Sequence, residues 1–242
     1  MRIKRKITYY INPGFLEIHS IFESIKYLLN KYRYDLQNKK LLDIGCGSKP
    51  YLSLFKQINI EYKGIDFRSY SNNYSYELNK PDYYFKKTYD KDYKLTQFEN
   101  DSYDIITAFQ ILEHHEKPEI FFPEVKRILR KGGFLIISFP FIWELHEEPN
   151  DFQRLTHYKI KQLCQENHLE VKEMIKRGSS LSVISQLINL SFLNLRTPLI
   201  KDLLYFILLL PLQFFSYIYD KISKNPRKTI FLGYTFLIKN RD

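Results

Sequence analysis

The chain has 242 residues, a formal net charge of +10 at pH 7 and two cysteines, Cys46 and Cys164. This length favours one substantial core with an appendage over two full domains. The cysteine count argues against a disulfide framework and favours a reducing, cytoplasmic setting. The positive charge suggests an anionic partner, either nucleic acid or the negative face of a membrane.

Apolar residues recur at three- and four-residue steps from Ile18 to Tyr32, which predicts an amphipathic helix. We expect this helix to belong to an N-terminal cap, residues 1–37, that packs on a sheet edge or covers a bound ligand. The basic N-terminus is not followed by a long apolar run, so no secretory signal is expected.

A short apolar strand, Leu41–Ile44, runs directly into a glycine turn. Gly45 and Gly47 put no side chain between the main chain and a ligand above the strand, so the turn is a candidate cofactor cradle. A dinucleotide fingerprint needs a third glycine three positions after the second, but Pro50 stands there. The turn therefore disfavours nicotinamide and flavin cofactors, and an ordinary strand-to-helix turn is the alternative. A helix over residues 51–57 should follow, with its first N–H groups facing the ligand.

A second strand, Glu61–Asp66, ends in a carboxylate about 20 residues beyond the turn, where dinucleotide folds bind ribose hydroxyls. We interpret Asp66 in this way; an aspartate that only starts a turn is the alternative. Residues 68–82 are rich in Ser, Asn and Tyr and predict a loop. A third strand is predicted at Tyr83–Tyr89, with Asp90 and Asp92 directly after it.

A fourth strand, Asp101–Ala108, leads into a polar segment that contains Gln110, Glu113 and His114. Open parallel sheets bind ligands at the carboxyl ends of their strands, so this segment is a second candidate for the site.

A helix is predicted at Pro118–Arg130, stopped by a left-handed cap at Lys131-Gly132-Gly133. A fifth strand, Phe134–Phe139, follows, then a helix at Thr156–Asn167 and a sixth strand at Leu169–Ile175. Alternating helices and nearly continuous apolar strands predict a parallel sheet that is covered on both faces.

Three segments resemble class I S-adenosylmethionine-dependent methyltransferases. Asp43-Ile44-Gly45-Cys46-Gly47 resembles their first motif, D-x-G-x-G-x-G, with Lys49 in place of the third glycine. Ser102 to His114 resembles their fourth-strand motif. The pattern H-x-x-P-x-D-x-x-R-x-T, from His146 to Thr156, resembles a block in bacterial members that include enzymes of cell-surface glycan or lipid pathways. The resemblance covers roughly residues 38–176.

This resemblance implies a Rossmann-like class I fold, in which a central, mostly parallel seven-stranded sheet has helices on both faces. The core would comprise residues 38–177 and a last, antiparallel strand within 229–242. An apolar helical insert, residues 178–228, would interrupt it.

The resemblance also implies the site. The expected cofactor, S-adenosylmethionine, would be bound by residues from the strand ends: Asp43, Gly45, Cys46, Gly47, Asp66, Asp90, Asp92 and Gln110. Asp66 would take the ribose, and either Asp90 or Asp92 the adenine amino group. Acceptor binding is assigned to Glu113, His114, Trp143 and Arg154, although an architectural role for Glu113 and His114 is the alternative.

A hydroxyl acceptor would benefit from a general base, and His146 is the first candidate because histidine is the side chain that ordinarily titrates near the working pH. Asp151 is expected as its orienter or as an alternative base. Arg154 would bind an anionic acceptor group or only pair with Asp151. No metal is expected, because the spacing of His146, Glu147, Asp151 and His157 matches no standard site.

The insert contains two stretches without charge, Ser179–Leu195 and Leu203–Tyr219. The second is short for a membrane span and contains Pro211, so an element that lies on the membrane surface fits better. Cationic residues follow it at the level of the lipid headgroups: Lys221, Lys224, Arg227 and Lys228. Helices buried against the sheet or against a second subunit are the alternative.

We therefore expect a methyltransferase that acts on a small molecule, a sugar or a lipid-linked acceptor, with peripheral membrane contact through residues 179–228 and a homodimer left open. Cell-envelope glycan biosynthesis is one setting for such an enzyme. A nucleic-acid methyltransferase is the alternative that the net charge favours, but the sequence has no recognisable nucleic-acid module. A non-catalytic cofactor-binding scaffold is the third reading.

Overall fold

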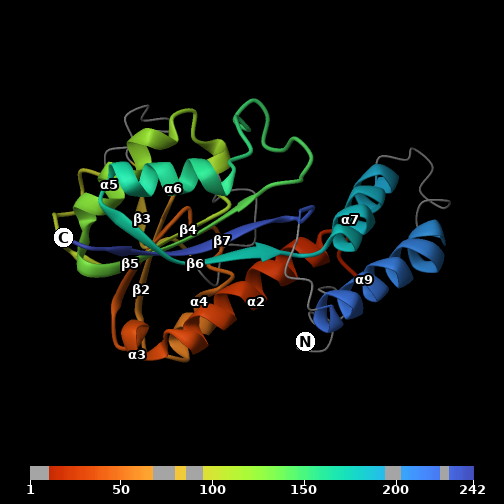
Figure 1. The fold of residues 1–242 in the computed structure, drawn as a ribbon, viewed down its shortest axis with the longest axis horizontal. Coiled ribbons are helices and arrows are strands. Elements are labelled where there is room, and N and C mark those ends of the chain that lie inside the picture. The colour runs from red at the N-terminus through yellow and green to blue at the C-terminus, as the bar shows by residue number, and fades with distance from the viewer. Residues whose placement is uncertain (1–10, 68–79, 86–94, 194–202, 224–228) are drawn as a thin grey trace.

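The protein is described by a computed structural model that covers residues 11–67, 80–85, 95–193, 203–223 and 229–242. Its centre is one seven-stranded sheet with the order β3-β2-β1-β4-β5-β7-β6 (Figure 1). The strands are β1 (Lys40–Ile44), β2 (Glu61–Asp66), β3 (Tyr83–Tyr84), β4 (Tyr103–Phe109), β5 (Leu129–Pro140), β6 (Leu169–Arg177) and β7 (Gly233–Asn240). β1 to β5 pair in parallel, and β7 is antiparallel to both β5 and β6. The expected Rossmann-like class I sheet is thus confirmed.

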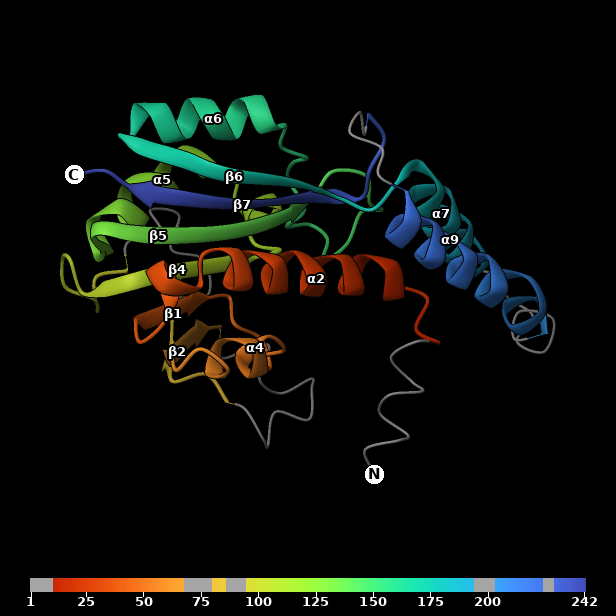
Figure 2. The same ribbon diagram turned by 60° about the horizontal axis from the view of Figure 1, so that its bottom comes forward.

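Helices cover both faces of the sheet (Figure 2). They are α2 (Phe15–Lys31), α3 (Arg33–Leu36), α4 (Leu52–Lys56), α5 (Pro118–Ile128) and α6 (His157–Glu166). Alternate residues of a strand point to opposite faces, so Leu42 and Ile44 of β1 pack in the core beneath α5 and α6. Leu41 points to the opposite face and packs in the core under α2 and α4. Both faces of β1 are buried, which explains its continuous apolar sequence.

The predicted glycine cap after α5 is wrong. The helix ends at Ile128, and Leu129 is already extended and pairs with Tyr103 of β4. The register between β4 and β5 then shifts, and the glycine pair lies inside β5 at this irregularity. A Cβ on Gly133 would lie 2.8 Å from the carbonyl oxygen of Asp104, so close backbone packing, rather than helix termination, requires the glycine.

Other boundaries differ by a few residues. The N-terminal helix begins at Phe15 instead of Ile18, and the last strand begins at Gly233 instead of Thr229. The described part of the third strand is Tyr83–Tyr84, and residues 86–94 lie outside the described range. The ends of a strand depend on where the neighbouring strand begins and ends, and the sequence of one segment does not show this.

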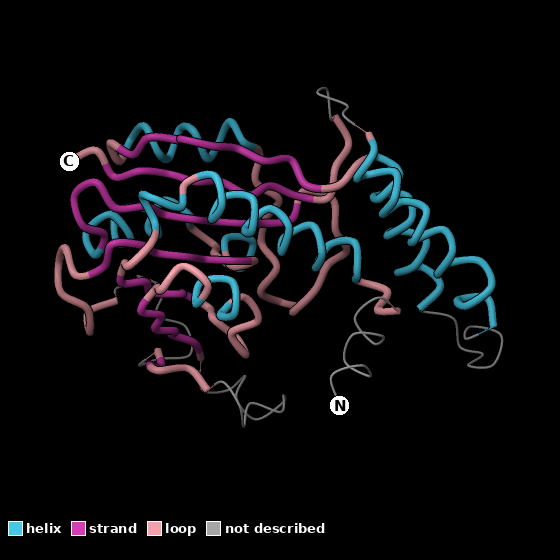
Figure 3. The backbone as a smooth tube through the Cα atoms, turned by 90° about the horizontal axis from the view of Figure 1, so that it is seen from below, coloured by secondary structure: helices cyan, strands magenta, loops and turns pink. Residues whose placement is uncertain are grey.

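The insert forms a helical hairpin that projects from the end of the sheet where β6 ends (Figure 3). Its elements are α7 (Ser180–Leu193), the π-helical turn η4 (Tyr205–Leu209) and α9 (Leu210–Ile222). Within the described residues, no helix is long and apolar enough to cross a membrane.

Arg177, the last residue of β6, joins the sheet, the N-terminal helix and the hairpin. Its side chain is fully buried, and Nη1 lies 2.7 Å from Oε1 of Glu17 in α2. Nη2 donates to the carbonyl oxygen of Phe139 in β5, and Nε donates to that of Tyr234 in β7. A Cβ on Gly233 would lie 2.1 Å from Nη2, so the guanidinium occupies the space that this glycine leaves.

We predict that Arg177→Met lowers the free energy of unfolding by about 3–5 kcal/mol, because it leaves the carboxylate of Glu17 buried without its partner. Arg241→Ala is the matched control, since Arg241 forms an exposed pair with Glu170 and should contribute less than about 1 kcal/mol. Urea denaturation of both variants measures the difference. Equal losses in the two variants would contradict the role assigned to Arg177.

Candidate active site

The glycine turn after β1 forms the floor of a cavity of about 260 Å³. Gly45 and Gly47 have φ values of +69° and +50°, which side-chain-bearing residues rarely adopt. A Cβ on Gly45 would lie 2.0 Å from Cδ1 of Ile111, so this position excludes other residues on two grounds. The cavity is lined by residues of the turn and of neighbouring strands: Asp43, Gly45, Cys46, Gly47, Ser48, Pro50, Tyr51 and Phe109. Its small residues leave the main chain accessible to a ligand.

Asp66 lies at the carboxyl end of β2, beside the turn. Oδ2 accepts a hydrogen bond from the Gly47 N–H at 2.5 Å, and Oδ1 accepts one from the Phe67 N–H at 2.7 Å. Burial raises the pKa of Asp66, and the two N–H donors oppose that shift. Each carboxylate oxygen keeps a second lone pair, so Asp66 is placed to accept both hydroxyls of a ribose.

Asp43 supports the turn from below. Oδ1 accepts from the hydroxyl of Thr107 at 2.6 Å, and Oδ2 accepts from the hydroxyl of Tyr62. Burial raises the pKa of Asp43 to about 7. These bonds hold β1 to its two neighbours at the level of the site. Sequence reasoning missed Thr107 and Tyr62, and a hydroxyl within the apolar run of β4 is the signal that could have found Thr107.

Lys49 stands where the first motif usually has its third glycine, and the structure shows how the lysine is accommodated. Its φ is +56°, and its ammonium lies 2.6 Å from Oδ2 of Asp82. The same oxygen accepts from the N–H of Gly64 in β2. The departure from the motif therefore ties the turn to the segment before β3.

The other four predicted cofactor residues differ in where they lie. Gln110 follows β4 at the carboxyl edge, and its amide nitrogen donates to the hydroxyl of Ser138 in β5 at 3.0 Å; it is not among the residues that line the cavity. Asp90 and Asp92 lie outside the described residues. Cys46 is buried in the turn beneath Gly64, where a Cβ would meet its sulfur at 2.5 Å.

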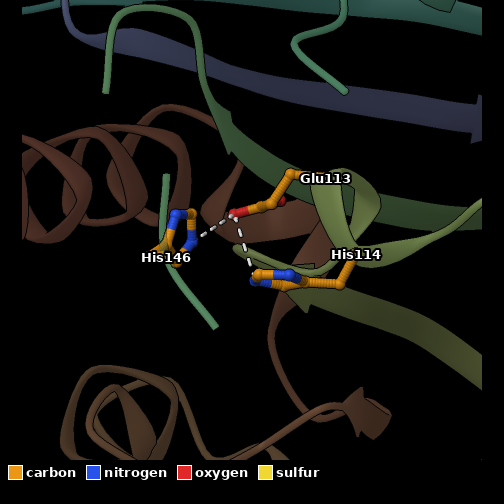
Figure 4. A group of neighbouring side chains, drawn as sticks. All are labelled: Glu113, His114 and His146. Atoms are coloured by element: carbon orange, nitrogen blue, oxygen red, sulfur yellow. Dashed lines mark ion pairs between the residues drawn. The ribbon is translucent and has the colours of Figure 1, made fainter. Parts of the chain in front are cut away.

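A polar cluster of Glu113, His114 and His146 lies at the carboxyl edge (Figure 4). Glu113 and His114 come from the 3₁₀ turn η3 (Leu112–His114) after β4, and His146 comes from the segment after β5. Oε1 of Glu113 lies 4.0 Å from Nε2 of each histidine. Glu113 is 1% exposed, and neither of its side-chain oxygens has a hydrogen-bond partner among the described residues. Burial raises the pKa of Glu113 to about 8.

Asp151 and Arg154 form a two-bond ion pair behind this cluster. Nη1 and Nη2 of Arg154 donate to the two carboxylate oxygens at 2.5 and 2.7 Å. These bonds lower the pKa of Asp151 to about 2, so the carboxylate is ionised and poorly suited to act as a base. Oδ2 also lies 3.1 Å from Nδ1 of His146 and accepts from its backbone N–H. Asp151 is thus placed as the orienter of His146, and Arg154 is engaged with Asp151.

Trp143 and a second hollow lie outside the groups described so far. Trp143 is half-buried in the segment between β5 and His146. A larger, open hollow of about 880 Å³ lies at the opposite edge of the sheet, beside Asp101 and Arg130. We place the site at the glycine turn, because ligands of parallel sheets bind at the carboxyl ends of the strands.

The sheet order and the site at its carboxyl edge define the Rossmann-like fold of class I S-adenosylmethionine-dependent methyltransferases. A family model described as "Methyltransferase domain" matches residues 16–176, and the chain belongs to this family. The cofactor that the family uses, S-adenosylmethionine, agrees with the turn, the cavity and Asp66. When bound, it supplies a methyl group on a sulfonium sulfur.

Solved structures agree on the fold. A putative sarcosine dimethylglycine methyltransferase from Galdieria sulphuraria superposes with a TM-score of 0.54 at 14% identity, covering 91% of this chain and 86% of that one. A methyltransferase from Archaeoglobus fulgidus that depends on the same cofactor gives 0.54 at 16% identity, covering 90% and 93%.

A curated relative is sterol 24-C-methyltransferase from Candida albicans, which is 27% identical over 135 residues. The match covers 52% of this chain, and the chain spans about a third (34%) of the length of that relative.

We predict that Asp66→Ala weakens S-adenosylmethionine binding by about 1–3 kcal/mol, because two ribose hydrogen bonds are lost. Asp35→Ala, on the exposed surface of α3, is the control and should bind normally. Isothermal titration calorimetry on folded variants measures both. Unchanged affinity in folded Asp66→Ala would remove Asp66 from the site.

Proposed function

We propose that this methyltransferase transfers the methyl group of S-adenosylmethionine to a hydroxyl of a small-molecule or lipid-linked acceptor, with sugars included in that class. The observation that carries the proposal is the oriented imidazole of His146, which follows β5 at the carboxyl edge of the sheet, the edge at which the glycine turn follows β1. Its Nδ1 faces two acceptors, Oδ2 of Asp151 and the carbonyl oxygen of Glu144, so the proton resides on Nδ1. Nε2 is then left with a lone pair for a hydroxyl proton.

Methyl transfer is a displacement in which the acceptor oxygen, the methyl carbon and the sulfur lie in line. The protein's task is to hold these three atoms and to exclude water. His146 would accept the hydroxyl proton, Asp151 would keep the imidazole in its tautomer, and Arg154 would keep Asp151 ionised. Trp143 and His114 would line the acceptor space.

The hairpin supports an acceptor that is held at a membrane. In a helical pair exposed to water, apolar residues face inward, but here most of the buried positions are polar, with Val183, Leu190 and Leu209 as the apolar ones. Nδ2 of Asn189 in α7 donates to Oε1 of Gln213 in α9 at 2.8 Å, and Oγ of Ser182 donates to Oδ2 of Asp220 at 2.6 Å. The buried positions of the pair include several polar residues: Ser182, Ser185, Gln186, Asn189, Gln213 and Ser216.

The outward faces of the same helices are apolar. Exposed side chains include Ile184, Leu187, Phe206, Ile207, Leu208, Phe214, Phe215, Ile218 and Ile222. Contiguous exposed apolar surface of this kind marks a contact with a protein or a membrane. We propose a membrane, because the net charge of +10 favours anionic headgroups and the last turn of α9 carries the cationic Lys221. Residues 224–228, with the other expected cations, lie outside the described range.

The comparison with a sterol methyltransferase is consistent with a small or lipid acceptor. A peripheral position on the inner membrane face and a role in the cell envelope are part of the proposal. The main rival remains nucleic-acid methylation, which the positive charge would favour.

Purified protein and methyl-labelled S-adenosylmethionine should be incubated with membrane lipids, polar metabolites and nucleic acids in parallel. We expect label in the lipid or polar-metabolite fraction and none in nucleic acid. His146→Asn, which keeps a donor for Asp151 but lacks Nε2, should reduce the labelling by at least about 100-fold if it is the base. Label confined to nucleic acid would overturn the proposal, and no label in any fraction would favour a cofactor-binding scaffold.

Phe214→Ser and Phe215→Ser together should weaken binding to vesicles that contain phosphatidylglycerol, each by on the order of tenfold, because an apolar side chain no longer enters the lipid. Tyr34→Ser is the matched control, since Tyr34 is 90% exposed but belongs to α3. Vesicle co-sedimentation measures binding.

Light scattering of the same variants separates the membrane from a second subunit. If the unaltered protein does not bind vesicles, and its dimer dissociates when the two phenylalanines are replaced, the apolar face is the contact with a second copy of the chain. That result would remove the membrane from the proposal.

A further inference from the structure

The geometry points to a divalent metal site formed by Glu113, His114 and His146, which would bind a first-row transition ion and the acceptor oxygen. This inference deepens the proposed function and depends on it for the identity of that oxygen. The sequence predicts no metal, because the spacing of His146, Glu147, Asp151 and His157 matches no standard site; Glu113 and His114, which precede His146 by more than 30 residues, are not in that set. Only the fold brings the three together.

The three groups converge at the separation that one ion requires. Metal–nitrogen and metal–oxygen bonds are about 2.0–2.2 Å long, so two ligands of one ion lie no more than about 4.4 Å apart. Oε1 of Glu113 is 4.0 Å from Nε2 of His114 and 4.0 Å from Nε2 of His146, and all three atoms lie within 4.8 Å of one another. Small side-chain rotations would bring the most distant pair of these atoms within the limit for two ligands of one ion.

Both imidazoles are oriented as metal ligands usually are. A ligating histidine donates its other ring N–H to a carbonyl or carboxylate, which fixes the tautomer and directs the lone pair at the ion. Nδ1 of His114 lies 2.9 Å from the carbonyl oxygen of Asn150, and Nδ1 of His146 lies 3.1 Å from Oδ2 of Asp151. Because carbonyl and carboxylate oxygens accept, each Nδ1 carries the proton. Both Nε2 lone pairs therefore face Glu113.

Glu113 provides the independent observation. Its carboxyl group is buried, points between the two rings (Figure 4), and has no hydrogen-bond partner among the described residues. A buried carboxylate is costly unless it is paired, holds a proton or binds a cation, and a cation between the two rings would stabilise its ionised form. Oε2 of Glu147, 4.0 Å from Nε2 of His114, lies at the exposed side and could add an oxygen ligand.

The ligand set selects the class of ion. Two imidazole nitrogens and one carboxylate suit Zn²⁺, Co²⁺, Mn²⁺ or Fe²⁺, whereas Mg²⁺ and Ca²⁺ prefer oxygen ligands. A bound ion would lower the pKa of a coordinated hydroxyl. That hydroxyl would lose its proton to water, its oxygen would bond to the methyl carbon, and the S–C electron pair would stay on sulfur. With metal bound, Nε2 of His146 would be a ligand, so its role as general base in the proposed function applies to the metal-free protein.

The test is titration of the purified, chelator-treated full chain with Co²⁺, followed by visible absorption and calorimetry. We expect one equivalent to bind, with a d–d spectrum that Zn²⁺ abolishes by competition. His114→Asn and His146→Asn keep the donors toward Asn150 and Asp151 but remove Nε2, and each should weaken binding by at least tenfold. His168→Asn, on the exposed surface, should bind Co²⁺ as the unaltered protein does. Thermal unfolding confirms that each variant is folded.

Absence of a bound equivalent, or binding that neither histidine variant weakens, would overturn the site. The metal readout does not depend on the acceptor, so failure of this inference and failure of the proposed function are distinct. Methyl transfer by a chain that binds no Co²⁺ would overturn the metal site alone. Specific Co²⁺ binding by a chain that methylates no acceptor would support the site and overturn the function.

Discussion

The buried guanidinium of Arg177 is the interaction on which the arrangement of the molecule depends. It lies where β6 ends and α7 begins, and its bonds to Glu17, Phe139 and Tyr234 join α2, β5 and β7 at one point. A fully buried charge is stable only when its donors are satisfied, so these elements cannot shift independently. The hairpin therefore leaves the sheet from a fixed point, and its direction relative to the active site is set by the core.

The active site follows from the geometry of a parallel sheet. Parallel strands end at one edge, so groups from separate segments meet there: the glycine turn after β1, Asp66 at the end of β2, Glu113 after β4 and His146 after β5. The cofactor side consists of backbone donors and one carboxylate. The side that we propose for the acceptor carries two imidazoles, whose Nδ1 atoms lie beside Asp151 and Asn150. This division matches a reaction in which one ligand is common to the family and the other differs between its members.

The proposed function links the hairpin to the polar cluster. In the hairpin, polar residues are buried and apolar residues are exposed: Asn189 and Gln213 bond to each other inside, and Phe214 and Phe215 lie on the outside. Apolar side chains exposed to water are unfavourable and an apolar environment would stabilise them, while the Asn189–Gln213 and Ser182–Asp220 bonds join polar groups inside the pair. A surface anchored in this way would hold the core near a lipid-linked acceptor, and the polar cluster would supply the group that receives it.

The sequence by itself determined the fold class and the position of the cofactor turn, because these depend on local patterns. Apolar strands of β1 and β4, the glycines at 45 and 47 and the acid at 66 are short-range signals with direct physical causes. The predicted end of α5 was wrong, because Leu129 pairs with Tyr103 in the sheet and this pairing outweighs the local glycine signal. Only the tertiary structure decided that Glu113, His114 and His146 converge. It also decided that polar side chains of the uncharged insert are buried between its two helices. Both depend on contacts between distant segments, which no local pattern specifies.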